Sequence, residues 1–207
     1  MMPKKIWSFW APRYERLWAQ HFALKPARDM VIEHLERVIG SHPCRILDVG
    51  CGVGQLAEEL AGHCSDWRVL GADTSPEMID SAIARHARPN VSFLNGSIDD
   101  ASRRGPFGVI VATNAFPYFP DKPVALRRLH AMLVSGGRLI LVHATIENPY
   151  DLLFMLFVRL TVSRGEYWST RRLGSRLREA GFRPGIVRPM RRAFFIPSLY
   201  LAEGIRP

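Results

Sequence analysis

Cysteine is scarce in this chain of 207 residues. The three cysteines, Cys44, Cys51 and Cys64, are odd in number and confined to one region. This pattern excludes a framework of disulfide bonds and predicts a protein of the reducing cytoplasm. Their spacings do not form a zinc site and no histidines cluster with them, so we expect no metal ion.

Long apolar runs are also missing. Hydrophobic residues make up 47% of the chain and charged residues 23%, as in a globular protein. The most apolar segment, Leu152 to Val162, is interrupted by Arg159 and has about half the length of a transmembrane helix. Residues 1–10 lack an apolar stretch suited to a secretory signal. We therefore expect one soluble domain over residues 1–207, and a peripheral membrane contact stays open.

Acidic residues are outnumbered by basic ones, 19 against 28, which gives a formal net charge of +9. The excess is concentrated between residues 159 and 192, where ten arginines face only Glu166 and Glu179. Arginine at this density indicates a solvated basic face, an anionic acceptor, an anionic membrane surface or RNA. Because no nucleic-acid motif accompanies the charge, we do not expect a nucleic-acid partner.

The most informative stretch is a glycine-rich turn that follows a short apolar run. Residues 46–49 predict a buried parallel strand, and residues 54–62 predict an amphipathic helix. The turn between them has glycine at alternate positions, Gly50, Gly52 and Gly54. Glycine allows unusual backbone angles and lets a ligand lie against the backbone, while the helix points free N–H groups at that ligand. A nucleotide-like ligand is therefore expected.

The spacing decides between nucleotide ligands. A dinucleotide fingerprint has glycine or alanine at its sixth position, where this chain has Gln55, and no lysine follows as in a P-loop. The pattern Asp48-x-Gly50-x-Gly52-x-Gly54 resembles motif I of class I S-adenosylmethionine (SAM)-dependent methyltransferases, of the small-molecule or lipid type with a domain 11/25-like sequence. The resemblance runs from about residue 30 to the C-terminus, with several motifs in the family's order.

This resemblance implies an α/β fold with a Rossmann-like sheet. Seven strands would run in the order 3-2-1-4-5-7-6, mostly parallel, with an antiparallel last strand and helices on both faces. The cofactor would be SAM, and the product S-adenosylhomocysteine (SAH). The three glycines would cradle the methionine and ribose of SAM, and Asp48 would order the loop or face the methionine amine.

An acidic residue ends the second predicted strand, residues 68–73. Asp73 lies about twenty residues past the glycine-rich turn, where a carboxylate that pairs with ribose hydroxyls belongs. Ser75 is the expected N-cap of the next helix. The third strand, residues 91–95, leads to Ser97, where the family usually has an acid that contacts adenine. Backbone at Ser97 and Ile98, or a shifted Asp99, could serve instead.

The acceptor side is predicted from the strands that follow. The fourth strand covers residues 107–113, and the resemblance places Asn114 and Ala115 along the methionine part of SAM. Phe116 and Tyr118 would point toward the acceptor. A helix from Lys122 to Leu133 and a Gly-Gly turn precede the fifth strand. His143 is expected just after that strand, as a structural histidine or a candidate general base.

Both ends of the domain carry less regular segments. Residues 1–29 form an aromatic arm, which either packs on the surface or covers the active site through Tyr14, also a weak catalytic candidate. A helix is predicted over residues 30–39. Residues 144–168 form an apolar insert, interpreted as a buried helix, an acceptor lid, a dimer face or a membrane contact. A helix over residues 170–180 and strands near 185–190 and 193–201 complete the prediction.

The predicted function is transfer of the SAM methyl group to a small or lipid-like, anionic or uncharged acceptor, by a monomer or homodimer. Methylation of RNA and a non-catalytic, SAM-binding regulatory role are the alternatives. The acceptor-binding residues are predicted to be Phe116, Tyr118 and His143. The cofactor-binding residues are predicted to be Tyr14, Asp48, Gly50, Cys51, Gly52, Gly54, Asp73, Thr74, Met78, Ser97, Ile98, Asn114 and Ala115.

Overall fold

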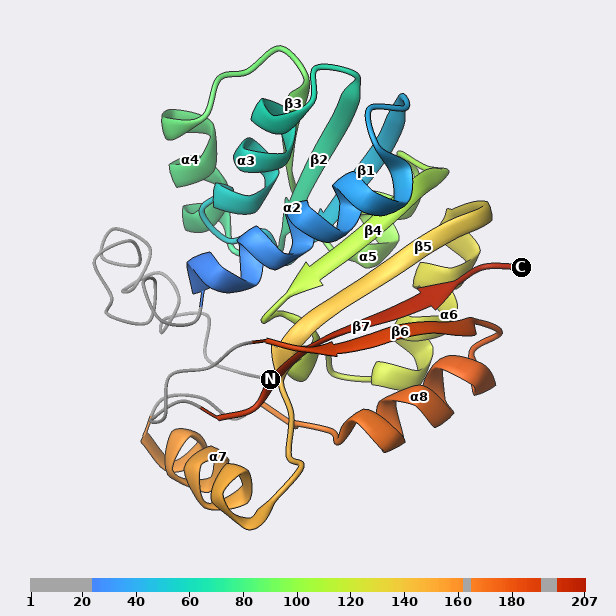
Figure 1. Cartoon of the computed structure of the whole chain (residues 1–207). Coiled ribbons are helices and arrows are strands. Elements are labelled where there is room, and N and C mark those ends of the chain that lie inside the picture. The colour runs from blue at the N-terminus through green and yellow to red at the C-terminus, as the bar shows by residue number, and fades with distance from the viewer. Residues whose placement is uncertain (1–23, 162–164, 191–196) are drawn as a thin grey trace.

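A seven-stranded sheet organises the chain in the order β3-β2-β1-β4-β5-β7-β6. This is the order that the family resemblance implies, and the prediction is confirmed. The computed structural model describes residues 24–161, 165–190 and 197–207 (Figure 1). Tyr14 and most of the predicted arm, residues 1–23, lie outside the described residues.

The strands are parallel except at one side of the sheet. Strand β7 runs antiparallel to both of its neighbours, β5 and β6, and all other pairs are parallel. The antiparallel ending is therefore confirmed. The strands are β1 (Cys44–Val49), β2 (Trp67–Asp73), β3 (Val91–Asn95), β4 (Phe107–Thr113), β5 (Leu133–Ala144), β6 (Arg183–Pro189) and β7 (Leu199–Ile205).

Helices cover both faces of the sheet, as predicted. Helices α2, α3 and α4 lie on one face and α5, α6 and α8 on the other (Figure 1). The helices are α2 (Lys25–Ile39), α3 (Gln55–His63), α4 (Pro76–Arg85), α5 (Ile98–Ser102), η3 (Phe116–Tyr118), α6 (Lys122–Met132), α7 (Pro149–Thr161) and α8 (Thr170–Glu179).

Strand β1 shows why the sequence forms two hydrophobic layers. Successive side chains of a strand point to opposite faces. Ile46 accordingly packs with α2 and α3, whereas Leu47 and Val49 pack with the residues of α5, α6 and α8. Ile46 and Leu47 are both fully buried. A strand that is covered on both faces has a nearly continuous apolar sequence. Because residues 46–49 are mostly apolar, they could be recognised as a strand and the glycine-rich turn could be placed at its end.

Several predicted boundaries differ from the structure: the Gly-Gly turn at residues 136–137 lies inside β5 rather than before it, and β6 begins at Arg183 rather than near residue 185. Helix α2 begins at Lys25 rather than at residue 30, because Pro26 occupies its first turn, where proline fits a helix. His143 lies inside β5, paired with Tyr200, and not after the strand. The last strand begins at Leu199 rather than 193, and residues 191–196 lie outside the described residues.

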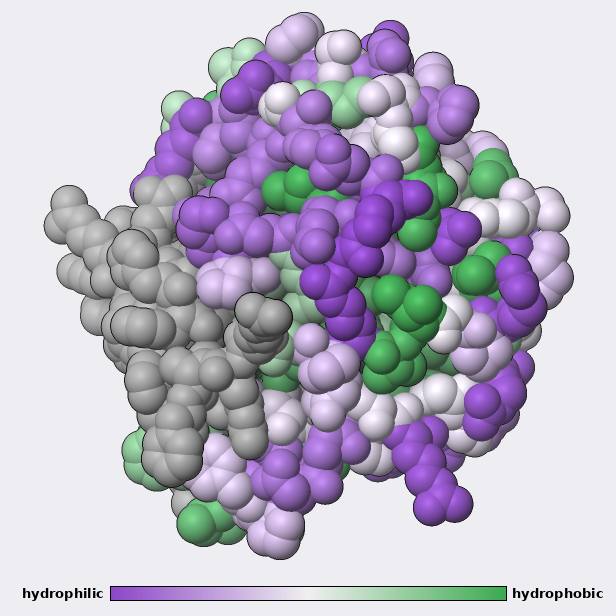
Figure 2. Space-filling view, viewed as in Figure 1, coloured by the Kyte–Doolittle hydropathy of each residue, from purple (hydrophilic) through white to green (hydrophobic). Residues whose placement is uncertain are grey.

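Helix α7 occupies most of the predicted insert 144–168. Asp151 fixes its start: the carboxylate is fully buried and accepts hydrogen bonds from the Asn148 side chain (2.8 Å) and the Ser198 backbone N–H (2.9 Å). The buried-helix interpretation is wrong, since much of the apolar surface of α7 faces solvent and shows as green at the lower left of Figure 2. Its exposed apolar residues are Tyr150, Leu152, Leu153, Leu156 and Phe157. No helix among the described residues is long and apolar enough to cross a membrane.

Candidate cofactor and acceptor site

The glycine-rich turn follows β1 at the carboxyl edge of the parallel strands. Gly50, Gly52 and Gly54 have φ values of +72°, +54° and +81°, a region that side chains with a Cβ rarely adopt. The backbone N–H of Gly50 donates to the carbonyl of Ala72 at 2.7 Å, which ties the turn to β2. The sequence therefore uses glycine here for a conformation that other residues resist.

The three glycines meet different surroundings. A Cβ on Gly50 would lie 2.4 Å from the Cβ of Ala115, and one on Gly54 would lie 2.7 Å from the Phe93 ring. A Cβ on Gly52 would meet no atom of the described residues within 4 Å. The first and last glycine thus allow close packing of the protein, whereas the backbone of Gly52 is open to a ligand.

Asp73 ends β2 and faces the turn. Its Oδ2 accepts from the Gly52 N–H at 3.0 Å, and its Oδ1 accepts from the Ser75 N–H at 2.9 Å. Burial raises the pKa of this carboxyl, and the backbone N–H groups of Ser75, Gly52 and Thr74 lower it in part. Since an ionised carboxylate can accept about four hydrogen bonds, Asp73 retains capacity for two vicinal hydroxyls.

Asp48 lies at the end of β1 below the same turn. It is 2% exposed, and its Oδ2 has no hydrogen-bond partner among the described residues. Burial and the nearby Asp73 raise its pKa to about 7, and Arg28 opposes the shift. A buried carboxylate oxygen without a partner is costly, so a cationic or hydrogen-donating group of a ligand would be stabilised beside it.

Asn114 leaves β4 with a strained backbone. Its φ is +56°, the only positive value at a described residue other than glycine, and its N–H donates to the Val142 carbonyl at 2.6 Å. The side-chain Nδ2 is buried without a partner in the described part of the chain. Strain and unpaired polar atoms together are typical of a binding site. These features of Gly52, Asp48 and Asn114 fit SAM.

The remaining predicted cofactor residues lie around this turn. The Cys51 sulfur packs beneath the turn, 3.0 Å from where a Cβ on Gly71 would stand, and burial raises the pKa of the thiol well above its usual value. Met78 is buried in the first turn of α4, and Thr74 is exposed just before that helix. Thr74 is thus accessible beside the turn, whereas Cys51 supports it from below.

Ser97 and its neighbours have local structural roles. The Ser97 hydroxyl caps α5 by accepting from the Asp100 N–H at 3.3 Å, and the Asp100 carboxylate accepts from the Ser97 N–H at 2.9 Å. Ile98 begins α5 and is half-buried against the core. Asp99 pairs with Arg128 of α6 at 2.9 Å.

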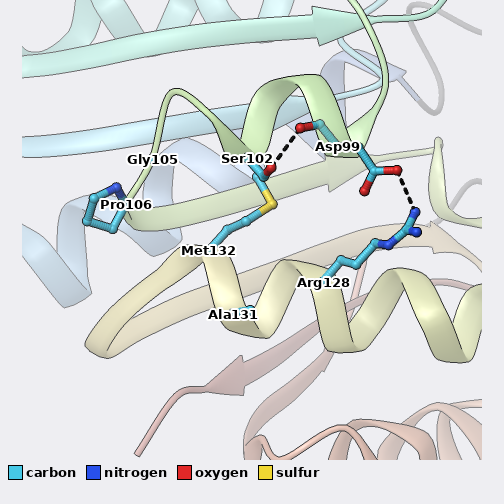
Figure 3. Close-up of a pocket in the computed structure, with 7 residues that line it drawn as sticks. All are labelled: Asp99, Ser102, Gly105, Pro106, Arg128, Ala131 and Met132. Carbon is cyan, nitrogen blue, oxygen red and sulfur yellow. Dashed lines mark hydrogen bonds and ion pairs between the residues drawn. The ribbon is translucent and has the colours of Figure 1, made fainter.

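Figure 3 shows the Asp99–Arg128 pair at a hollow of about 470 Å³ between α5 and α6. The Asp99 side chain is thereby committed to α6. An adenine contact from Asp99 would require this pair to break, and the Ser97 N–H already donates to Asp100, so the backbone of Ile98 is the better candidate.

The acceptor side contains an aromatic cluster. Phe116, His143 and Trp168 are all at least 97% buried, and the Phe116 ring centroid lies 5.4 Å from that of His143 and 5.5 Å from that of Trp168. Burial and the charge of Lys122 lower the pKa of His143 to about 4. Its ring nitrogens have no partner among the described residues. This environment keeps the imidazole neutral, and a pKa of about 4 makes it a weak general base near neutral pH.

A second set of polar groups lies above this cluster. The hydroxyls of Tyr118 and Tyr167 are 3.2 Å apart, and the buried Lys122 ammonium pairs with Glu166 at 3.3 Å. The Glu166 N–H donates to the Pro117 carbonyl at 2.9 Å, so the segment before α8 is fixed against η3. Sequence reasoning missed Tyr167, because no local pattern reveals that residues 165–168 cross η3.

Two further supports of the turn were missed. Arg28 of α2 donates to Glu59 at 2.9 Å and to the Gln55 side chain at 3.2 Å, beside Asp48. The prediction assigned Arg28 to the arm, although Ala27, Val31 and Leu35 repeat at helical spacing and could have extended the helix. The Phe93 ring packs where Gly54 and Gly71 leave room.

No cluster of three or more metal-binding side chains exists among the described residues.

Part of the chain is similar to known proteins. Residues 46–137 match the family described as "Methyltransferase domain". Trans-aconitate 2-methyltransferase of Deinococcus radiodurans is 34% identical over 119 residues, which are 57% of this chain and 45% of that protein. Malonyl-[acyl-carrier protein] O-methyltransferase of Acetivibrio thermocellus is 33% identical over 92 residues, 44% of this chain and 32% of that protein. The aligned part thus spans less than half of either relative.

Solved structures match over nearly the whole chain. A methyltransferase of Haloferax volcanii, solved in complex with the activator Trm112, superposes with a TM-score of 0.77, 19% identity and 97% coverage of both chains. Magnesium protoporphyrin IX methyltransferase of Synechocystis PCC 6803 with bound SAM superposes with a TM-score of 0.71, 18% identity, and coverage of 99% of this chain and 97% of that one. At these identities the likeness establishes the fold.

Proposed function

We propose that this chain, which carries a class I SAM-dependent methyltransferase domain, transfers the SAM methyl group to a small or lipid-like acceptor with an anionic group. The observation that carries the proposal is the carboxyl edge of the sheet. Four groups lie around the turn at this edge. They are the open backbone at Gly52, the two carboxylate oxygens of Asp73, and the side-chain atoms of Asp48 and Asn114 that have no partner among the described residues.

When bound, SAM supplies a methyl group that its sulfonium already activates. The protein therefore contributes chiefly binding and alignment, which alone can account for a large share of a rate enhancement. Asp73 would accept hydrogen bonds from the ribose hydroxyls, and Asp48 would face the methionine amine. Gly50 and Gly54 keep the turn packed so that these groups stay in place.

The acceptor class is supported by the relatives and by charge. The names of the two relatives describe acceptors that are carboxylic acids or their thioesters. Residues 159–192 hold ten arginines against two glutamates, and this positive charge favours an anionic acceptor. The half-buried rings of Tyr118 and Tyr167, which lie beside the buried aromatic cluster, suit an apolar part of the same molecule. A carboxylate acceptor needs no general base, because it reaches the site already deprotonated.

The experiment is a turnover assay with a panel of acceptors. Purified protein is incubated with SAM and with trans-aconitate, a malonyl thioester, a fatty acid or transfer RNA, and SAH is measured. We expect SAH with at least one of the three acids and none with RNA. The matched control is Asp73→Asn, which should abolish turnover by weakening SAM binding.

Two results would contradict this proposal. Tight SAM binding without SAH formation across a wide acid panel would favour the regulatory alternative, a SAM-binding protein without turnover. Methylation of RNA alone, with an affinity that falls steeply as salt is raised, would favour the nucleic-acid alternative.

A further inference from the structure

A second hollow lies at the opposite end of the strands from the glycine-rich turn. Its volume is about 480 Å³, and it lies over the first residues of β1, β2 and β3. Three of the lining residues are arginines, and none is an aspartate or glutamate. The polar and aromatic residues that line it are Arg45, Arg68, Arg104, Asn90, Ser92 and Phe107.

The strand register forces two of these arginines together. Arg45 of β1 and Arg68 of β2 are direct partners in the parallel pairing, so their side chains leave the same face of the sheet on adjacent strands. Like charges at such cross-strand positions are destabilising. The folded protein therefore contains an unfavourable pair of like charges at these two positions.

The hollow exists because this face is only partly covered. Helix α5 has five residues, Ile98–Ser102, and leaves the beginnings of the neighbouring strands exposed. Arg45, Arg68 and Ser92 are all exposed on this face, whereas Trp67, on the opposite face, is fully buried. The arginines thus stand at the rim of a recess whose floor includes apolar side chains.

The guanidinium groups are positioned but not neutralised. Arg45 lies over the Phe107 ring, 5.6 Å from its centroid, and donates to the carbonyl of Arg104. Within the described part of the chain, neither Arg45, Arg68 nor Arg104 has a carboxylate partner. Arginines elsewhere do, such as Arg88 with Glu58 at 2.6 Å.

We propose that this hollow binds a small polyanion that carries two or more phosphate or carboxylate groups. Guanidinium groups bind both kinds of oxyanion through paired hydrogen bonds, and two adjacent forks would each take one group. The apolar floor formed by Leu70 and Phe107 would hold the uncharged part of the ligand. Because the site lies at the amino edge of the sheet, it is separate from the proposed cofactor cleft and does not depend on the proposed function.

The test measures binding of tripolyphosphate and of citrate by calorimetry at constant ionic strength, which distinguishes a phosphate site from a carboxylate site. The variant Arg45→Gln/Arg68→Gln removes the adjacent pair. The matched control, Arg37→Gln/Arg127→Gln, removes the same charge from exposed positions on α2 and α6 that line neither this hollow nor the one between α5 and α6. We expect saturable binding of at least one probe, weakened about tenfold or more for each arginine removed from the pair, and within about twofold of wild type in the control.

Thermal unfolding distinguishes a loss of ligand binding from a loss of stability in the variants. Without ligand, the pair variant should melt at or above the wild-type midpoint, because repulsion is relieved. With saturating probe, only the wild type and the control should gain stability. Absence of binding to wild type, equal loss in the control variant, or binding that requires long single-stranded RNA would each overturn the proposal.

Discussion

The two ends of the parallel strands hold opposite charges in opposite environments. At the carboxyl edge, Asp48 and Asp73 are buried beneath the glycine-rich turn, and burial raises the pKa of both carboxyls. At the amino edge, Arg45 and Arg68 are exposed side by side. Desolvation of a charge costs far more than repulsion between solvated charges. Burial of the carboxylates at the carboxyl edge therefore costs more free energy than the repulsion between the arginines at the amino edge.

Mutations at the buried carboxyl edge should therefore have larger effects than mutations at the exposed amino edge. We expect the largest effects at the glycines of the turn. Gly50→Ala should destabilise the ligand-free protein by about 2–4 kcal/mol, because its Cβ would clash with Ala115 at a positive φ. Gly52→Ala should cost only about 1 kcal/mol from backbone strain, because its Cβ meets no described residue within 4 Å, yet it should weaken SAM binding by about a hundredfold or more, because the Cβ would enter the proposed cofactor space. Urea unfolding and calorimetry measure the two quantities. Equal effects of both variants on both quantities would contradict the separate roles.

His143 tests whether the acceptor side holds a base or a structural residue. With a folded pKa of about 4 against an ordinary 6.5, the imidazole favours proton uptake by the unfolded chain. Its contribution to stability is therefore complete above about pH 6.5 and is lost as the pH falls toward 4, by about 3 kcal/mol. His143→Phe should remove this acid-dependent loss and retain turnover. A loss of turnover above a hundredfold with normal SAM binding would instead identify His143 as a base.

The affinity for SAM at the carboxyl edge should depend on pH through the ionisation of Asp48. If the amine of the cofactor binds beside the ionised carboxylate, SAM affinity should rise about tenfold from pH 6 to pH 7.5 and then level off, because the pKa of Asp48 is about 7. Asp48→Asn should bind more weakly and without this slope, as calorimetry at several pH values would reveal. A wild-type affinity that is flat over this range would show that Asp48 does not ionise on binding.

The smallest effect is expected at the amino edge without ligand. Arg68→Gln alone should raise the free energy of unfolding by about 0.2–0.5 kcal/mol at low salt, and 0.5 M salt should remove the gain. The control Arg127→Gln should change it by less. A destabilisation that persists in salt would mean that Arg68 packs rather than repels.

The fold could be predicted because its signals are local. The apolar run before Gly50, the acid that ends β2 and the cap at Ser75 each occupy a few consecutive residues, and each was placed correctly. The order of the motifs then implied the topology through the family resemblance. Boundaries failed where a local rule has two readings, as at Pro26, which ends a segment in one reading and begins a helix in the other.

Parts of the site could not be predicted, because they depend on contacts between distant residues. Nothing near Phe93 indicates that its ring fills the space left by Gly54 and Gly71. The contact between Tyr118 and Tyr167 joins segments 49 residues apart. The pairing of Asp99 with Arg128, which would compete with an adenine contact of Asp99, is equally invisible in sequence.

The most direct test of the central claim is calorimetric titration of the protein with SAM and SAH, beside Asp73→Asn and with NAD as a control ligand. We predict micromolar binding of SAM and SAH, a loss of at least a hundredfold in the variant, and no binding of NAD. Failure of the folded wild-type protein to bind either sulfur nucleotide would contradict the assignment of the carboxyl edge as a cofactor site.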